Sequence, residues 1–140
     1  MHRAVLQASG WRLGKRIGGM PVIELATVGR RSGARRTVVL SAPIVEGDRL
    51  VLVASRGGAD RHPDWYRNLV RHPRVEVTRG RTTECMVART ASPAERADLW
   101  DRVVEAYDGY AAYQRRTERQ IPLVICEPCG SGAGDGDGAA

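Results

Sequence analysis

Runs of apolar, β-forming residues separated by short turns occupy most of the middle of the chain. The first three runs follow one another across two turns rich in glycine and charged residues, and they are expected to form a meander. Later runs alternate apolar with polar positions, as strands with one solvated face do. Strands are therefore predicted at 22–28, 37–45, 50–54, 75–78, 83–90 and 121–126.

Two spans, one near the middle of the chain and one later, carry the signals of helices. Pro63 is suited to open a short helix whose apolar side is formed by Trp65, Leu69 and Val70. Ser92 and Glu95 have the spacing of a capping box, which fixes the start of a longer helix. The apolar stripe predicted for this longer helix consists of Ala97, Trp100, Val104 and Tyr107.

The two ends of the chain differ from its middle. Leu6, Leu13 and Ile17 fall on one helical stripe, which predicts an amphipathic helix within residues 1–20. Residues 130–140 contain only glycine, alanine, serine and aspartate, a composition typical of disorder. The remaining span, 21–129, is expected to form one mainly β domain with helices (α+β), a small closed or split barrel of mostly antiparallel strands.

The charge of the chain comes almost entirely from arginine. The net charge is +6, and Lys15 is the only lysine. Arginine suits phosphate and carboxylate groups, so a nucleic acid, an anionic membrane surface or an acidic small ligand could each be the partner. The amphipathic N-terminal helix keeps peripheral membrane contact open as a minor alternative, although no apolar run reaches the length of a membrane span.

Three cysteines, Cys85, Cys126 and Cys129, argue by their odd number against a disulfide-stapled secreted scaffold, and a reducing cytoplasm is the simpler interpretation. Cys126 and Cys129 have the two-residue spacing of redox and zinc pairs, but they end a strand instead of opening a helix. No histidine pair offers the remaining zinc ligands. We therefore expect neither a metal site nor cysteine catalysis.

Three segments have the residue types of a binding site. The turn Gly29-Arg30-Arg31-Ser32-Gly33, with Arg36 beyond it, gathers guanidinium groups and flexible backbone in one hairpin, which suits phosphate or carboxylate groups. Ser55-Arg56-Gly57-Gly58 follows a strand, where paired glycines allow close approach of a ligand or simply form a loop. Within the predicted helix, Trp65 and Asn68 lie one turn apart, and Trp65 suits either a ligand wall or the core.

Tyrosines recur at intervals of three residues late in the chain. Tyr107, Tyr110 and Tyr113 would share one side of a helical segment and direct three hydroxyls to one place. The alternative is that the rings pack against the barrel while the hydroxyls reach water.

The order of these motifs resembles the deazaflavin-dependent nitroreductases. The resemblance runs from about Pro21 to Pro128 through the segments 25–33, 54–59, 63–69, 107–114 and 117–122. It implies a split β-barrel, similar to the FMN-binding barrels, that binds coenzyme F420, an 8-hydroxy-5-deazaflavin. It also implies an oxidoreductase that passes a hydride from the reduced cofactor to a quinone, enone or nitro-aromatic acceptor. Val39 and Ser41 depart from residues common in the family.

The resemblance also assigns residues to the site. The arginine-rich turn with Arg36, and the segment from Ser55 to Gly58, would surround the phosphate and acidic tail of the cofactor, with Trp65 and Asn68 beside it. Ser55 and the three tyrosines would line the space for the acceptor. An FMN-binding or haem-binding barrel, and a basic nucleic-acid-binding barrel, stay open as alternatives.

Overall fold

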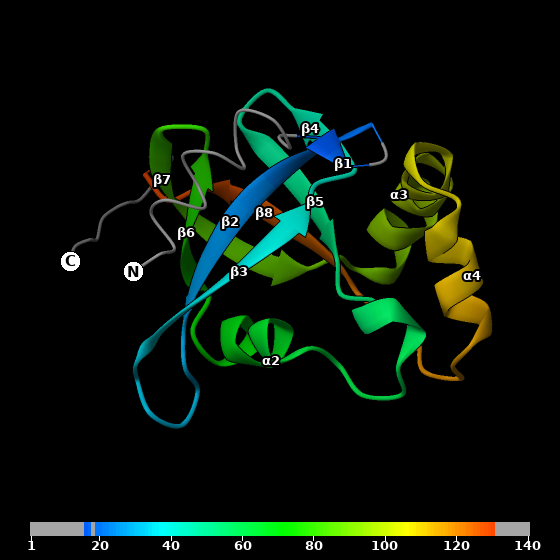
Figure 1. The fold of residues 1–140 in the computed structure, drawn as a ribbon, viewed down its shortest axis with the longest axis horizontal. Coiled ribbons are helices and arrows are strands. Elements are labelled where there is room, and N and C mark those ends of the chain that lie inside the picture. The colour runs from blue at the N-terminus through cyan, green and yellow to red at the C-terminus, as the bar shows by residue number, and fades with distance from the viewer. Residues whose placement is uncertain (1–15, 18, 131–140) are drawn as a thin grey trace.

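The computed structural model describes residues 16–17 and 19–130 of the chain, and its ribbon is drawn in Figure 1. Its strands are β1 (Arg16–Ile17), β2 (Met20–Val28), β3 (Arg35–Ser41), β4 (Ile44–Glu46), β5 (Arg49–Val53), β6 (Arg74–Arg79), β7 (Thr82–Thr90) and β8 (Leu123–Pro128). Its helices are the 3-10 turn η1 (Arg56–Gly58), α2 (Asp64–Arg71), α3 (Pro93–Ala106) and α4 (Gly109–Arg115).

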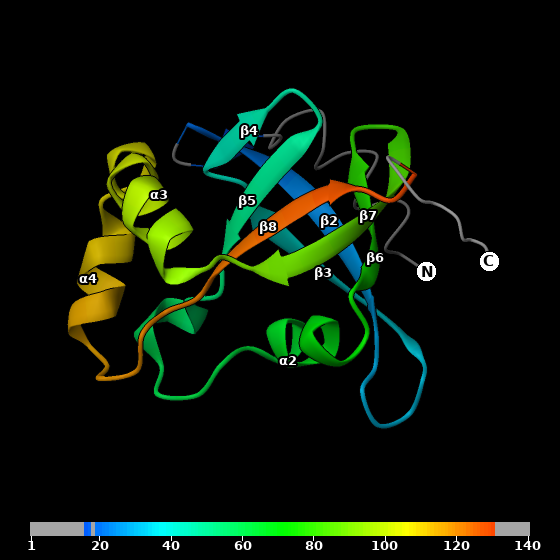
Figure 2. The ribbon, with the colours of Figure 1, turned by 180° about the vertical axis from the view of Figure 1, so that it is seen from behind.

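The strands form one antiparallel sheet in the order β1-β2-β6-β7-β8-β5-β4, and β3 adds to it by pairing with β2. The view from behind shows the strong curvature of this sheet, with β5, β8 and β7 crossing β2 and β3 (Figure 2). The chain therefore has the predicted mainly β architecture, an open, split barrel with helices around it.

The predicted meander is wrong in its second strand. The span expected as one strand at 37–45 is divided at Ala42-Pro43, because proline has no N–H to donate to a ladder. Before this break β3 pairs with β2, and after it β4 pairs with β5. The Ala42 N–H instead donates to the Pro21 carbonyl. The result is that β3 pairs with β2 and takes no part in the hairpin formed by β4 and β5.

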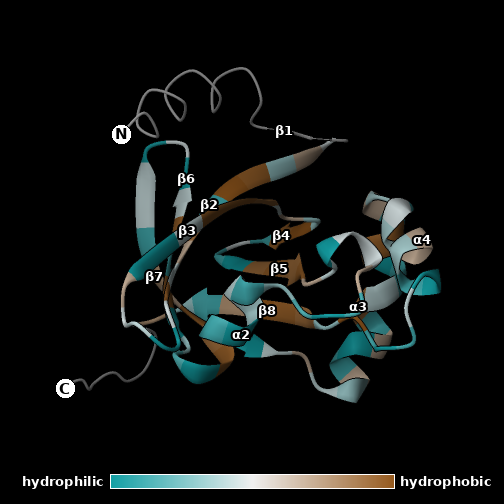
Figure 3. Cartoon of the chain, turned by 60° about the horizontal axis from the view of Figure 1, so that its bottom comes forward, coloured by the Kyte–Doolittle hydropathy of each residue, from teal (hydrophilic) through white to brown (hydrophobic). Residues whose placement is uncertain are grey.

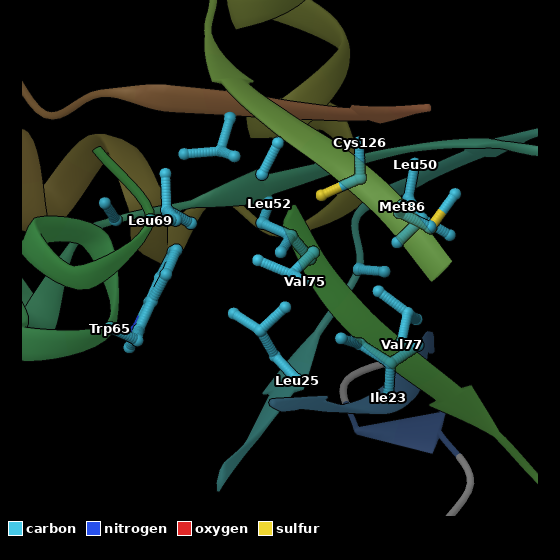
Figure 4. Close-up of a cluster of buried hydrophobic side chains, with 14 residues drawn as sticks. Ile23, Leu25, Leu50, Leu52, Trp65, Leu69, Val75, Val77, Met86 and Cys126 are labelled. Atoms are coloured by element: carbon cyan, nitrogen blue, oxygen red, sulfur yellow. The ribbon is translucent and has the colours of Figure 1, made fainter. Parts of the chain in front are cut away.

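Two apolar clusters fill the two faces of the sheet. Along β8, Val124 and Cys126 belong to one cluster, while Leu123 and Ile125 belong to the other, as the two-residue period of a strand requires. Figure 4 shows Trp65 and Leu69 of α2 closing the first cluster beside Leu25. Brown stretches mark the buried strands in Figure 3, whereas α2 is mostly teal on its outer side.

The helices begin where the sequence predicts, but their buried faces differ. The capping box of α3 is present, with Ser92 accepting from the Glu95 N–H and Glu95 accepting from the Ser92 N–H. The buried residues of α3 are Leu99 and Val103, and the predicted Ala97 is exposed.

Trp100 of α3 and Val70 of α2 are both less buried than predicted. Arg96 stacks over the Trp100 ring at 4.5 Å and donates to the Ile121 carbonyl, and Trp100 packs partly buried against the second cluster. On α2, Val70 is 59% exposed, so it is not part of the apolar side.

The odd number of cysteines argued against a disulfide-stapled scaffold, but the structure contains one disulfide. Cys85 and Cys129 form a disulfide, and Cys126 is a buried free thiol whose pKa burial raises to about 12. The partner of Cys129 is on β7 because Met86 lies opposite Pro128 in an antiparallel pair, which brings Cys85, the residue before Met86, to Cys129, the residue after Pro128. A cross-strand pair 44 residues apart in sequence gives no local spacing signal.

The predicted ends lie largely outside the described residues. Of the expected helix at 1–20, residues 16–17 form β1 and Met20 starts β2, because both pair in the sheet. Of the predicted disordered tail 130–140, Gly130 is described and is part of a turn. Residues 131–140 and most of the predicted helix lie outside the described residues. In the described part of the chain no helix is long and apolar enough to cross a membrane.

Candidate functional site

The arginine-rich turn between β2 and β3 is a loop folded on itself. The Gly29 N–H donates to the Ala34 carbonyl at 2.7 Å, and the Gly33 N–H donates to the Gly29 carbonyl. The Ser32 hydroxyl oxygen accepts from the Ala34 N–H at 3.1 Å. A Cβ on Gly29 would lie 2.8 Å from that oxygen, so any other residue there would force the Ser32 side chain to move. Arg31 and Arg36 are exposed around this framework.

Asn68 of α2 fixes this loop to the helix. Its Oδ1 accepts from the backbone N–H of Arg30 at 3.1 Å and from the Arg30 guanidinium at 2.9 Å. Its Nδ2 donates to the Thr27 hydroxyl at 3.2 Å. The Asn68 side chain is buried, where an unmade hydrogen bond is costly. The sequence predicted Asn68 beside a cofactor, and the structure gives it this role of holding the loop.

A cavity of about 590 Å³ opens between this loop and α2. We call it the arginine pocket. Among the residues predicted for cofactor binding, six line it: Arg30, Arg31, Ser32, Arg36, Trp65 and Asn68. The sequence did not single out five others as site residues: Thr27, Thr37, Val38, Arg61 and Asp64. Asp64 stands four residues before Asn68, so helical spacing could have added it, but the strand residues give no comparable signal.

Trp65 lies at the boundary between the core and the arginine pocket. It is 9% exposed and packs in the first apolar cluster, and it also lines the arginine pocket. Val38 and Leu40 of β3 pack partly buried against the same cluster. The pocket therefore has a charged loop on one side and an apolar wall on the other.

The segment from Ser55 to Gly58 lies outside the arginine pocket. Gly58 has φ +85°, and a Cβ there would come within 2.6 Å of the Tyr113 carbonyl of α4. The close approach expected for a ligand is thus made by the protein at Gly58. Gly57, with φ +63°, has open space around its Cβ position, and Arg56 is a non-glycine residue at positive φ, 48°.

Arg119 holds this segment in place. Its guanidinium donates to the carbonyls of Ala54, Ser55 and Ala59. The same group lies 2.8 Å from His62 Nδ1, which must be unprotonated because a guanidinium can only donate. Burial, followed by the charges of Arg119 and Arg67, lowers the pKa of His62. Arg119 was part of a recognised motif, but the sequence assigned it no role.

The three tyrosines form one tyrosine cluster, Tyr107, Tyr110 and Tyr113, with ring centroids 5.1–6.2 Å apart. Tyr107 ends α3, whereas the other two are on α4. The hydroxyls of Tyr107 and Tyr113 are 3.4 Å apart, and this hydrogen bond is the main cause that raises the pKa of Tyr107. The Tyr110 hydroxyl is buried and donates to Met20 Sδ, and burial raises the pKa of Tyr110 to about 12.

The strand β3 joins the two regions. It starts at Arg35 beside the arginine pocket and ends at Ser41, which pairs with Val22 of β2. Two residues earlier on β2, Met20 contacts Tyr110. A strand of this length spans about 20 Å. The arginine pocket and the tyrosine cluster therefore lie toward opposite ends of one strand. Among the described residues, no group of side chains could hold a metal ion.

This geometry can be set beside known proteins. Residues 1–128 match the family described as F420H(2)-dependent quinone reductase. The chain belongs to this family. It is 36% identical over 129 residues to an F420H(2)-dependent quinone reductase of Mycobacterium tuberculosis, covering 89% of this chain and 86% of that protein. A solved F420-H2 dependent reductase, FDR-A, superposes with a TM-score of 0.69 at 39% identity, covering 76% of this chain and 94% of that one.

Membership of the F420H(2)-dependent quinone reductase family confirms the predicted split-barrel fold, the predicted enzyme class and coenzyme F420 as the cofactor. A haem binding protein from Mycobacterium smegmatis has the same fold with a TM-score of 0.56, covering 90% of this chain and 51% of that one. At 16% identity this likeness shows the fold alone.

Proposed function

We propose that this member of the F420H(2)-dependent quinone reductases transfers a hydride from reduced coenzyme F420 to a quinone, with the cofactor lying along β3. The observation that carries the proposal is the placement of a guanidinium-lined cavity and a pair of facing phenols toward opposite ends of that strand. A long cofactor needs the guanidinium-lined cavity for its anionic tail and the phenols beside its planar head.

The residues present fit the anionic part of the cofactor. Arg31, Arg36 and Arg61 line the pocket and can offer charge-assisted hydrogen bonds to phosphate or carboxylate oxygens. Asn68 holds Arg30 through its Nη1, and the rest of the Arg30 guanidinium is available to the cofactor. Trp65 and Val38 supply an apolar wall for the part of the cofactor beyond the charges.

The tyrosine cluster fits the acceptor. Bound in its reduced form, coenzyme F420 supplies a hydride, and a quinone that accepts it must also gain a proton at oxygen to become a hydroquinone. Tyr107 and Tyr113 present hydroxyls to one place, and Tyr107, whose pKa is raised by its hydrogen bond to Tyr113, is protonated near neutral pH and can donate a hydrogen bond to the acceptor. Ser55 remains a candidate for a further donor, held by Arg119 through its carbonyl.

A binding titration tests the cofactor assignment. We expect fluorescence titration to give saturable binding of the deazaflavin in the micromolar range or tighter, with FMN and NADPH unable to compete. Saturable FMN binding without any response to the deazaflavin would refute the proposal. A nucleic-acid partner is disfavoured because Trp65 packs in the core instead of being displayed on an exposed strand face.

Steady-state kinetics with a naphthoquinone test the acceptor site. Tyr107→Phe or Tyr113→Phe should lower kcat about tenfold or more and leave the deazaflavin Kd nearly unchanged, since a donor to the acceptor acts mainly in the transition state. Tyr110→Phe is the matched control, because its hydroxyl already contacts Met20, and it should change the rate less. If all three variants turn over at the wild-type rate, the phenol hydroxyls have no part in the mechanism.

A further inference from the structure

The arginine pocket contains a single carboxylate among the residues that line it. Asp64, in the first turn of α2, shares the cavity with Arg30, Arg31, Arg36 and Arg61. Its Oδ1 lies 3.4 Å from Arg30 Nη2, and its side chain is 80% exposed. A negative charge at this place opposes the anions that the arginines attract.

Asp64 is not needed to place Arg30. The backbone N–H and the Nη1 of Arg30 both donate to the buried Asn68, which is itself held by Thr27. An exposed ion pair at a distance of 3.4 Å adds little to stability. The charge of Asp64 is therefore free to act on whatever enters the pocket.

The position of Asp64 on α2 strengthens this effect. The N-cap residue of α2, Pro63, makes no side-chain cap hydrogen bond, so the first-turn N–H groups carry the positive end of the helix dipole. Asp64 is the acidic residue in that turn and offsets this positive potential. An anion in the pocket thus meets the negative charge of Asp64 beside the positive helix end.

We propose that Asp64 is a specificity-determining residue, which lowers the preference of the arginine pocket for polyanions over phosphate groups of low charge. Coulombic repulsion at a fixed distance grows in proportion to the charge of the ligand. A singly charged phosphodiester is therefore opposed least, and a phosphomonoester or polyphosphate more. This inference rests on the proposed function, in which the pocket receives the anionic part of the cofactor.

The test uses inorganic anions, so that it does not depend on turnover. Isothermal titration of the full chain at pH 8 and constant ionic strength would compare phosphate with tripolyphosphate. Asp64→Asn should tighten phosphate binding about threefold and tripolyphosphate binding about tenfold, because twice the charge squares the factor. Asp64→Glu keeps the charge and should restore the wild-type ratio of the two affinities.

The control removes the same charge elsewhere. Asp101→Asn, on the exposed side of α3, should leave both affinities within about twofold of wild type. Weaker binding in Asp64→Asn, or an equal gain for both anions, would overturn the inference.

A deazaflavin titration on the same variants separates this inference from the proposed function. If the anions respond as expected while no variant binds the deazaflavin, the proposed function fails and the role of Asp64 stands. If the deazaflavin binds but the ratio of the two anion affinities is the same in Asp64→Asn as in wild type, the proposed function stands and the role of Asp64 fails.

Discussion

The arginine pocket and the tyrosine cluster are held in place in different ways. In the pocket, Arg31 and Arg36 are exposed, and the loop that precedes β3 is fixed to α2 through one buried amide, Asn68. In the cluster, three rings pack on one another, and the backbone of α4 touches Gly58. Charge can be presented by flexible side chains because it acts at a distance, whereas hydroxyls must be positioned by packing.

This difference predicts that changes in the cluster cost stability and changes in the pocket cost affinity. Tyr110 gives the largest expected effect. It is 7% exposed and packs with Ile121 and Val103 in the second apolar cluster. Tyr110→Ala should lower the free energy of unfolding by about 3–5 kcal/mol through the cavity it leaves.

Tyr110→Phe is the matched variant for this experiment. It removes only a hydroxyl bonded to a thioether, a weak acceptor, so it should cost about 1 kcal/mol or less. Urea denaturation of both variants measures the two losses. Similar losses in the two variants would mean that the hydroxyl, and not the ring, holds the cluster.

The neighbouring glycines of η1 offer a second comparison, with a smaller expected effect. Gly58→Ala places a Cβ within 2.6 Å of the Tyr113 carbonyl at φ +85° and should cost about 2–4 kcal/mol. Gly57→Ala has similar backbone strain at φ +63° but open space, and should cost about 1 kcal/mol. Thermal melts of the pair isolate the contact with α4, and equal shifts in Tm would contradict it.

A feature could be predicted from the sequence when it depends on residues that are close together in the chain. Strands and the capping box at Ser92 follow from short-range patterns, and these were predicted. The tyrosine cluster was predicted from a spacing of three, although Tyr107 lies before α4, because the turn at Asp108-Gly109 still brings its ring to the others.

Features that depend on long-range pairing were not predictable from the residues alone. The Asn68 contact with Arg30 joins positions 38 residues apart, and the disulfide joins positions 44 apart. The proline at 43 was visible in the sequence, yet its effect on the meander depends on which strand lies beside β3. The sequence also grouped the Ser55 segment with the arginine loop, whereas the fold packs that segment against α4.

Within the pocket, Arg30 and Arg31 should respond differently to the same change. Alanine at either position removes a guanidinium and should weaken deazaflavin binding about tenfold. Arg30→Ala also leaves Asn68 with one hydrogen bond fewer, so amide hydrogen exchange in residues 29–36 should become faster in this variant alone. Faster exchange in Arg31→Ala as well would show that the loop depends on its overall charge and not on Asn68.

The smallest expected effect is a pH dependence at the edge of the Ser55 segment. Because the pKa of His62 is lowered in the folded protein from its usual value of 6.5, the unfolded chain takes up a proton more readily as the pH falls through 6.5. The stability contributed by neutral His62 is therefore complete above this pH and is lost below it. Protonation also abolishes the acceptor at Nδ1 that faces Arg119. Since the ring is partly exposed, the loss between pH 7.5 and 5 should stay under about 1 kcal/mol.

His62→Gln supplies a side-chain acceptor that does not titrate, so it should flatten this part of the stability profile. His72→Gln, at the end of α2, removes a histidine outside the Ser55 segment and serves as the control. Urea denaturation at both pH values measures the change in each variant. A profile that stays as steep in His62→Gln as in wild type would assign the acid sensitivity to another group and leave Arg119 to hold the segment through its three carbonyl contacts.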